Sequence, residues 1–242
     1  MPRAPILLAF DTATSVCSVA LATAGAIHEI ARDVGQRHTE HLLSMVDELF
    51  AARSLSLGEC DAIAFGAGPG SFTGLRVACG VAQGLAYGID RPLIPVSNLA
   101  AAALDVFEQC PDARTVLVAQ DARMNEAYVG VYALAAERVV EVAAPSLAAP
   151  ADLLAFAARH AADTIAGSAL QAFQHELRAF DGKRVEGTVG TARAVARLAL
   201  AALDAGATVE AAAAAPIYVR DRVALTVEER RARGGPFAQA SA

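Results

Sequence analysis

The stretch Asp61–Arg76, DAIAFGAGPGSFTGLR, does most to determine the fold of this chain. Its apolar start predicts a strand, and the residues from Leu75 to Tyr87 have the spacing of a helix. A glycine-rich loop between a strand and a helix directs backbone N–H groups toward an anion in many phosphate-binding proteins. The single lysine of the chain, Lys183, lies far from this loop, which excludes the G-K-[ST] ending of a P-loop NTPase. The loop is therefore either a phosphate contact of another kind or a scaffold.

The composition limits the classes of function. The chain has 242 residues, is 55% hydrophobic and carries a formal net charge of −6. No apolar stretch approaches the roughly 20 residues of a spanning helix, so we expect a soluble, cytoplasmic protein with no membrane segment. The negative charge argues against tight independent binding of nucleic acid. The four cysteines are far apart in sequence, so we expect reduced core thiols.

The secondary-structure signals repeat once along the chain. Strand patterns at 6–10, 16–22, 26–31 and 61–65, with helices around 42–50 and 75–88, are followed by a similar series from 115 to 203. The order βββ-α-β-α, twice, predicts a duplicated α/β architecture of the actin-like ATPase (ribonuclease H-like) kind, as in actin, sugar kinases and Hsp70 ATPases. An unrelated two-domain α/β protein is the alternative. We expect domains at 1–97 and 98–229, the second closed by helix 192–203, and a disordered tail at 230–242.

The first predicted hairpin turn, Asp11–Ser15, is where nucleotide-binding members of that superfamily contact phosphate. Ala13 stands where such a turn needs glycine, and its Cβ narrows the approach of an anion. Asp11 either holds a metal-bound water or caps the turn, and the turn role is favoured. The candidate vestigial nucleotide or phosphate contacts are Asp11, Thr12, Gly68, Gly70 and Ser71.

Two other groups of polar residues attract attention. The second hairpin carries a cluster of Asp121, Arg123, Glu126 and Tyr128, which we interpret as a structural turn in which Arg123 pairs with a carboxylate. An acid/base pair of Asp121 and Glu126 is the alternative. His38 and His41 are three residues apart at a helix start, but no third metal ligand has clear spacing to them, so solvated or interface histidines are favoured.

Helix 75–88 has an unusual glycine repeat. Gly80, Gly84 and Gly88 recur every four residues, although each mid-helix glycine costs about 1 kcal/mol relative to alanine. This suggests that another backbone packs closely on that face, either the protein's own sheet or another subunit. Together with the apolar stripe of helix 42–50, it gives a candidate interface of Leu42, Met45, Val46, Leu49, Arg76, Gly80, Gly84 and Tyr87.

Several strings together resemble the TsaB family, the dimerization subunit of the bacterial complex that makes N6-threonylcarbamoyladenosine in tRNA. They are Ile6–Ser15, RHTEHLL at 37–43, GPGSFTGLR at 68–76, DARMNEAY at 121–128 and PIYVR at 216–220. The resemblance implies a non-catalytic paralogue of the threonylcarbamoyltransferase. In that enzyme an H-x-x-x-H pair binds a metal, and Asn98 and Ala102 occupy those two positions here.

The resemblance further implies the partners. The N-terminal domain would pair with the catalytic paralogue, TsaD, or with itself when alone. An ATPase subunit, TsaE, would join the complex, and tRNA reading codons that start with A would be reached indirectly. We expect no cofactor in this subunit, with ATP, Mg²⁺ and the active-site metal held by the partners. The alternatives are a stand-alone ATPase or kinase and, less favoured, a metallopeptidase using His38 and His41.

Overall fold

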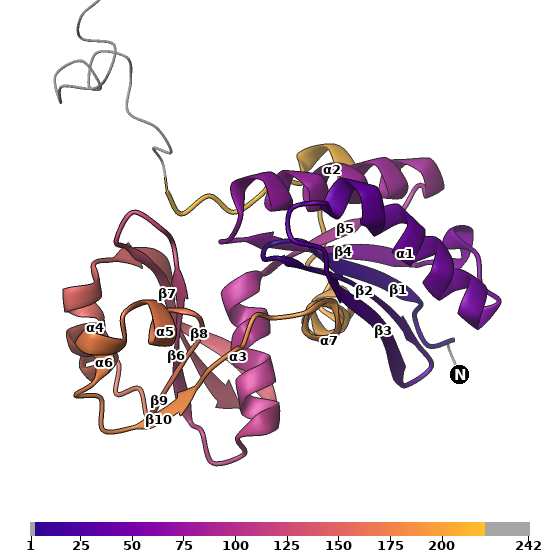
Figure 1. Cartoon of the computed structure of the whole chain (residues 1–242). Helices are drawn as coiled ribbons and strands as arrows, with labels where there is room; N and C mark the ends of the chain where they lie inside the picture. Colours follow the sequence, from indigo (N-terminus) through magenta and orange to yellow (C-terminus); the bar gives the residue numbers. More distant parts are fainter. Residues whose placement is uncertain (1–2, 221–242) are drawn as a thin grey trace, which may run out of the picture.

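The structure, a computed structural model, describes residues 3–220 and contains two five-stranded sheets with the same topology (Figure 1). The strand order is β3-β2-β1-β4-β5 in the first sheet and β10-β9-β6-β7-β8 in the second, which is the same order read from the other edge. In each sheet the first three strands are antiparallel, and the fourth and fifth run parallel to the first. This repetition confirms the duplicated actin-like α/β architecture.

The strands of the first sheet are β1 (Leu7–Asp11), β2 (Val16–Thr23), β3 (Ala26–Asp33), β4 (Ala62–Gly68) and β5 (Leu93–Ser97). Those of the second are β6 (Thr115–Asp121), β7 (Ala127–Ala135), β8 (Arg138–Ala148), β9 (Thr164–Ala166) and β10 (Lys183–Val185). The longer helices are α1 (His38–Arg53), α2 (Phe72–Ile89), α3 (Asn98–Gln109) and α7 (Ala192–Asp204). The shorter ones are α4 (Leu153–Arg159), α5 (Ala169–Ala172) and α6 (Gln174–Leu177), with 3-10 turns at Leu57–Glu59, Pro150–Asp152 and Ala211–Ala213.

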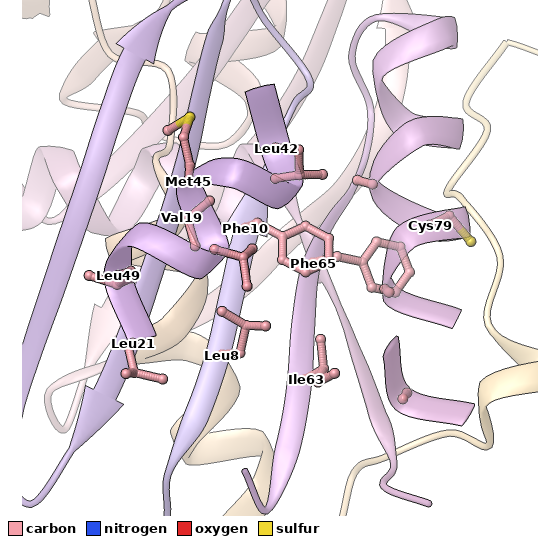
Figure 2. Close-up of a cluster of buried hydrophobic side chains, with 14 of the residues drawn as sticks. Leu8, Phe10, Val19, Leu21, Leu42, Met45, Leu49, Ile63, Phe65 and Cys79 are labelled. Carbon is pink, nitrogen blue, oxygen red and sulfur yellow. The ribbon is translucent and has the colours of Figure 1, made fainter. Parts of the chain in front are cut away.

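One face of the first sheet is covered by α1 and α2 (Figure 2). The core there combines Leu8 and Phe10 of β1 and Phe65 of β4 with the apolar stripe of α1. The members of that stripe assigned above to a subunit interface are at most 4% exposed: Leu42, Met45, Val46 and Leu49. The interface prediction is wrong for these four residues, because they already bury their side chains against the protein's own sheet.

The other face of the first sheet is covered by α7, which comes from the second half of the sequence. Strand β1 is buried on both sides, so the residues alternating with Leu8 and Phe10, namely Leu7 and Ala9, also need a cover. Val195 of α7 belongs to the core cluster that contains them. The expectation that helix 192–203 closes the second half is therefore wrong, because the helix closes the first sheet instead.

The second sheet is packed against α3 on one face and against α4 and the short helices on the other. The boundary expected at residue 97 coincides with the passage from β5 to α3, but the chain returns to the first sheet with α7 and again at the bridge between Leu93 and Val209. The two units are thus interlocked. The predicted disordered tail at 230–242 lies outside the described residues.

Two further expectations bear on the class of protein. All four cysteines are free and buried, which confirms their interpretation as core thiols. Among residues 3–220, no helix has the length and apolarity needed to cross a membrane.

The position of α7 predicts how a fragment would behave. Residues 1–97 alone should bind a hydrophobic dye strongly, because the face of the first sheet that α7 covers is then open to solvent. Adding a peptide of residues 186–220 should suppress the dye fluorescence. The matched control is the same peptide with Val195→Asp, a change at a fully buried position. Dye binding that is equally low with and without the peptide would contradict the assignment of α7 to this face.

Candidate functional site

The hairpin turn between β1 and β2 packs directly into the glycine-rich loop at the start of α2. The backbone N–H of Ser71 donates to the Ala13 carbonyl at 2.8 Å, and the Thr12 hydroxyl donates to the Gly74 carbonyl at 2.7 Å. A Cβ on Gly70 would lie 2.7 Å from the Ala13 Cβ, and one on Gly74 would overlap the Thr12 carbonyl oxygen. The loop needs these glycines because the protein's own backbone approaches it this closely.

Asp11 ties three separate segments of the chain together. Its Oδ1 accepts from the Ala13 backbone N–H at 3.0 Å and its Oδ2 accepts from the Asn98 amide. The other side of that amide, Asn98 Oδ1, accepts from the Gly68 backbone N–H at 2.7 Å. A Cβ on Gly66 would overlap the Asp11 carboxylate. The turn role favoured for Asp11 is confirmed, and the same residue also joins β1 to β4 and α3.

Burial dominates the ionisation of Asp11. The side chain is only 2% exposed, and burial raises its pKa to about 6 against the opposing effects of the Ala13 and Asn98 hydrogen bonds. Above that pH the carboxylate is stabilised by two neutral N–H donors rather than by a cation. This arrangement suits a structural joint between segments.

The structural role of Asn98 was not predicted from the sequence. The family resemblance identified this residue only as a replacement for a metal-binding histidine. The residue is 4% exposed at the start of α3, and both ends of its amide are hydrogen-bonded. Ala102, one helical turn later, is fully buried. Its place in the sequence could have indicated this role. Asn98 directly follows β5, and the parallel strands β1 and β4 end at the same edge of the sheet, at Asp11 and at the glycine loop.

The second hairpin turn forms the predicted polar cluster. The Arg123 N–H donates to Asp121 Oδ1 at 2.8 Å, and its guanidinium lies 3.2 Å from Asp121 Oδ2, as expected for a turn started by aspartate. Glu126 instead pairs with Arg220, whose guanidinium also lies 6.0 Å from the centre of the Tyr128 ring. Asp121 and Glu126 thus each pair with an arginine.

A strap of residues 209–220 crosses from the first sheet to this second hairpin (Figure 1, yellow). It begins at the Leu93–Val209 bridge, and the Ile217 N–H donates to the Ala67 carbonyl in the glycine loop at 2.7 Å. A Cβ on Gly68 would lie 2.6 Å from the Ile217 carbonyl oxygen, so the strap also occupies the space beside the loop. In the sequence analysis, residues 216–220 contributed only to the family resemblance. Their structural role was not predicted.

The two histidines at the start of α1 differ in environment. His38 is 5% exposed, and burial is the main cause that lowers its pKa. Its Nδ1 and the Nε2 of His41 have no hydrogen-bond partner within the described part of the chain. No group of three or more His, Cys, Asp or Glu side chains between residues 3 and 220 is placed to hold a metal ion.

The outward face of α2 is open. Gly80, Gly84 and Gly88 are exposed, and a Cβ added to any of them would meet, apart from its chain neighbours and the adjacent backbone of α2, no atom of residues 3–220 within 4 Å. Arg76 and Tyr87 are exposed on the same helix, Tyr87 to 84%. Packing of the glycine repeat against the protein's own sheet is therefore wrong for the described residues. The other alternative, contact with another subunit, stays a prediction.

Comparison with protein families gives a match over residues 25–226 to the family described as TsaD: tRNA N6-adenosine threonylcarbamoyltransferase. Among curated relatives, the tRNA threonylcarbamoyladenosine biosynthesis protein TsaB of Haemophilus influenzae is 52% identical over 122 residues, which are 50% of this chain and 51% of that protein. The Escherichia coli TsaB is 43% identical over 126 residues, 52% of this chain and 54% of that protein. The matches to these relatives thus span about half of their length.

A solved structure extends the similarity over most of the chain. The protein named YeaZ from Pseudomonas aeruginosa superposes with a TM-score of 0.79 at 34% identity, covering 88% of this chain and 99% of that one. A second structure from the same organism, described as similar to the peptidase YeaZ, superposes with a TM-score of 0.80 at 34% identity, covering 89% and 100%.

Glycines that pack against the first hairpin and glycines on the open face of α2 should respond oppositely to substitution, as measured by the free energy of unfolding. Gly66→Ala should lower the free energy of unfolding by about 2 kcal/mol or more, because the new Cβ overlaps the Asp11 carboxylate. Gly80→Ala is the matched control and should raise it by about 1 kcal/mol, because the position is open and alanine favours the helix. Urea denaturation followed by circular dichroism measures both. A stable Gly66→Ala protein would contradict the packing of the turn into the loop.

Asp11→Asn tests the joint and its pH dependence. The variant keeps the shape but leaves one of the two buried N–H donors without an acceptor, which should cost about 1–3 kcal/mol at pH 7.

The folded pKa of Asp11, about 6, lies above its value of 3.8 in a model compound, so between these pH values the folded state binds more protons than the unfolded state. The contribution of Asp11 to stability therefore falls as the pH rises from about 4 to about 6 and is constant above that. The stability difference between wild type and variant should follow this curve. The raised pKa of Asp105 is common to both proteins and cancels. A difference that grows with pH in this window would overturn the raised pKa.

Proposed function

The chain belongs to the family of tRNA N6-adenosine threonylcarbamoyltransferases and, within it, to the TsaB group; from this premise we propose that it is a non-catalytic scaffold subunit. In this role it binds the catalytic threonylcarbamoyltransferase paralogue, of the TsaD type, and supports formation of N6-threonylcarbamoyladenosine next to the anticodon of tRNA. Its place of action is then the cytoplasm, where tRNA is modified.

The observation that carries the proposal is the structural environment of Asn98 and Ala102. These are the positions that the family resemblance equates with the metal-binding histidines of the catalytic paralogue. Both ends of the Asn98 amide are committed to Asp11 and Gly68, and Ala102 is a fully buried apolar residue. Carbon offers no metal ligand, and an amide already hydrogen-bonded at both ends is a poor one. A subunit of this kind contributes through binding.

The outward face of α2 is the surface that fits such a role. Glycines one turn apart, with nothing of the described chain over them, allow the backbone of a partner helix to approach closely. Tyr87 at one end of the face is the kind of large, amphipathic side chain that anchors protein interfaces. We assign the face to the catalytic paralogue in the complex and to a second copy when the chain is alone.

The remaining components follow from this assignment. An ATPase subunit of the TsaE type joins through the complex, tRNA is reached through the catalytic subunit, and ATP, Mg²⁺ and the active-site metal are held by the partners. These are proposals that rest on the family.

The two enzymatic alternatives find less support in the geometry. An independent ATPase or kinase would need the glycine loop for phosphate, but Thr12 and Ala13 of the first hairpin pack against it. A metallopeptidase would need a third ligand beside His38 and His41, and residues 3–220 place none there.

Gly84→Leu tests the proposed role. The purified wild-type chain mixed with its catalytic paralogue should form a heterodimer, measured by light scattering, and should restore tRNA modification in a reconstituted reaction. The variant should lose both, because a leucine side chain fills the space that a partner backbone needs. Its thermal stability should be equal or higher, because leucine has the greater helix propensity and position 84 is open.

The matched control is Gly58→Leu, an exposed glycine in the 3-10 turn 57–59 with equally open space around it. This variant should pair normally. Undiminished modification in the complete absence of the wild-type chain, or failure of the wild type to form any complex, would overturn the scaffold function.

A further inference from the structure

Three side chains form a stacked cluster at the N-terminal end of α2, next to the open glycine face. Phe72 and Arg76 come from the first two turns of α2, and Tyr218 comes from the strap. The guanidinium carbon of Arg76 lies 3.7 Å from the centre of the Phe72 ring and 5.9 Å from that of Tyr218. The Arg76 Nε donates to the Tyr218 hydroxyl at 3.0 Å. We call these three residues the arginine clamp.

The clamp holds Arg76 in place without neutralising it. Within residues 3–220, five arginines form ion pairs with carboxylates, and Arg76 is not among them. The hydrogen bond to Tyr218 uses Nε, and no acceptor in the described chain is paired with either terminal nitrogen. A guanidinium fixed in a plane with both terminal nitrogens free is preorganised for two parallel hydrogen bonds to one carboxylate.

The clamp is also partly open to solvent and held rigidly. Phe72 is 39% exposed and Tyr218 is 45% exposed. The strap is fixed on both sides of Tyr218, since the Ile217 N–H donates to the Ala67 carbonyl before it and Arg220 pairs with Glu126 after it. A partner that binds here meets side chains already in position, so little conformational entropy is lost on binding.

The clamp continues the open face of α2 in space. Arg76 lies one helical turn before Gly80 and two before Gly84, so the three positions share one side of the helix. A protein element that packs along the glycines therefore reaches Arg76 at its end. Arginine and tyrosine are also among the residue types enriched in the hot spots of protein interfaces.

The covered face of Phe72 and the net charge of the chain both favour a protein over a nucleic acid as the occupant of the clamp. The face of Phe72 that a base would need for stacking is already covered by the guanidinium. The chain as a whole carries a net charge of −6, which disfavours a polyphosphate backbone. A single carboxylate on an apolar protein element satisfies Arg76 and leaves the rings to pack against side chains.

We propose that the arginine clamp of Phe72, Arg76 and Tyr218 is a second contact of the α2 docking face and receives an acidic side chain of the protein partner. This rests on the scaffold function proposed above and adds the strap, through Tyr218, to the partner-binding surface. It also gives a functional reason for the strap to follow α2 so closely.

The test measures the affinity of the full-length chain for its catalytic paralogue by titration calorimetry. Arg76→Ala should weaken the complex about tenfold or more, because it leaves the partner's carboxylate without its pair. Arg76→Lys should also weaken it, since an ammonium cannot reproduce the planar geometry. Tyr218→Phe keeps the ring but removes the hydroxyl that orients Arg76, and should weaken binding several-fold. The Arg76→Ala complex should also be less sensitive to ionic strength than the wild-type complex.

The matched control is Arg159→Ala, an exposed helical arginine on α4 in the other half of the molecule, which should bind within twofold of wild type. If Arg76→Ala binds like wild type while Gly84→Leu does not bind, the proposed role of the clamp is wrong and the scaffold function is unaffected. A wild type that does not bind the paralogue would instead overturn the scaffold function.

Two further outcomes would assign the clamp to a different occupant and so overturn the proposal. One is an Arg76→Ala protein that loses only its self-association, which indicates a second copy of this chain. The other is loss of binding to a single-stranded anticodon-loop oligonucleotide with unchanged affinity for the paralogue. If Arg76→Ala lowers the melting temperature, Tyr218→Phe at unchanged melting temperature decides the question.

Discussion

The buried hydrogen bonds that join Asp11, Asn98 and the Gly68 backbone are the constraint on which the centre of this molecule depends. They connect the end of β1, the end of β4 and the start of α3, and all the participating side chains are almost completely buried. A buried carboxylate and amide are stable only when each polar atom has a partner, so the three segments must arrive together. The same joint brings the first hairpin turn against the glycine loop, which fixes where α2 begins and which of its faces points outward.

The first sheet is completed by parts of the chain that are distant in sequence. Helix α7 covers the face that α1 and α2 leave open, and the strap then passes along α2 to reach the second hairpin through Arg220 and Glu126. The first sheet therefore depends on the second half of the chain for burial of its apolar surface. None of these returning segments lies within 4 Å of a Cβ built on Gly80 or Gly84, and this open part of α2 supports its assignment to another chain.

The sequence predicted what depends on local pattern and missed what depends on long-range contact. The meander of β1 to β3, the long helices and the repeated topology follow from periodicity and turn residues. Strand β10 has only three residues and carries too few side chains for a period to appear. The apolar stripe of α1 was visible, but whether Leu42 and Met45 face a core or a partner depends on what lies opposite, and helical spacing alone contains no such information. Asn98 was missed for a similar reason, since its partners, Asp11 and Gly68, are 87 and 30 residues away.

The glycines of the loop and the glycines of α2 are explained by two different physical causes, and this distinction changes the functional interpretation. Gly66, Gly70 and Gly74 are required by the protein's own atoms, because a Cβ at any of them would collide with the first hairpin. Gly80 and Gly84 have no such neighbour in the described chain, although a glycine within a helix costs stability that alanine would restore. An internal requirement explains the first group completely, so the loop needs no phosphate to account for its composition. Residues 3–220 give no internal explanation for the second group, and the proposed partner backbone that packs against α2 supplies one. The glycines of the loop that resembles a phosphate cradle in sequence are therefore accounted for by internal packing, and the glycines most informative about the proposed function are those on the helix that follows it.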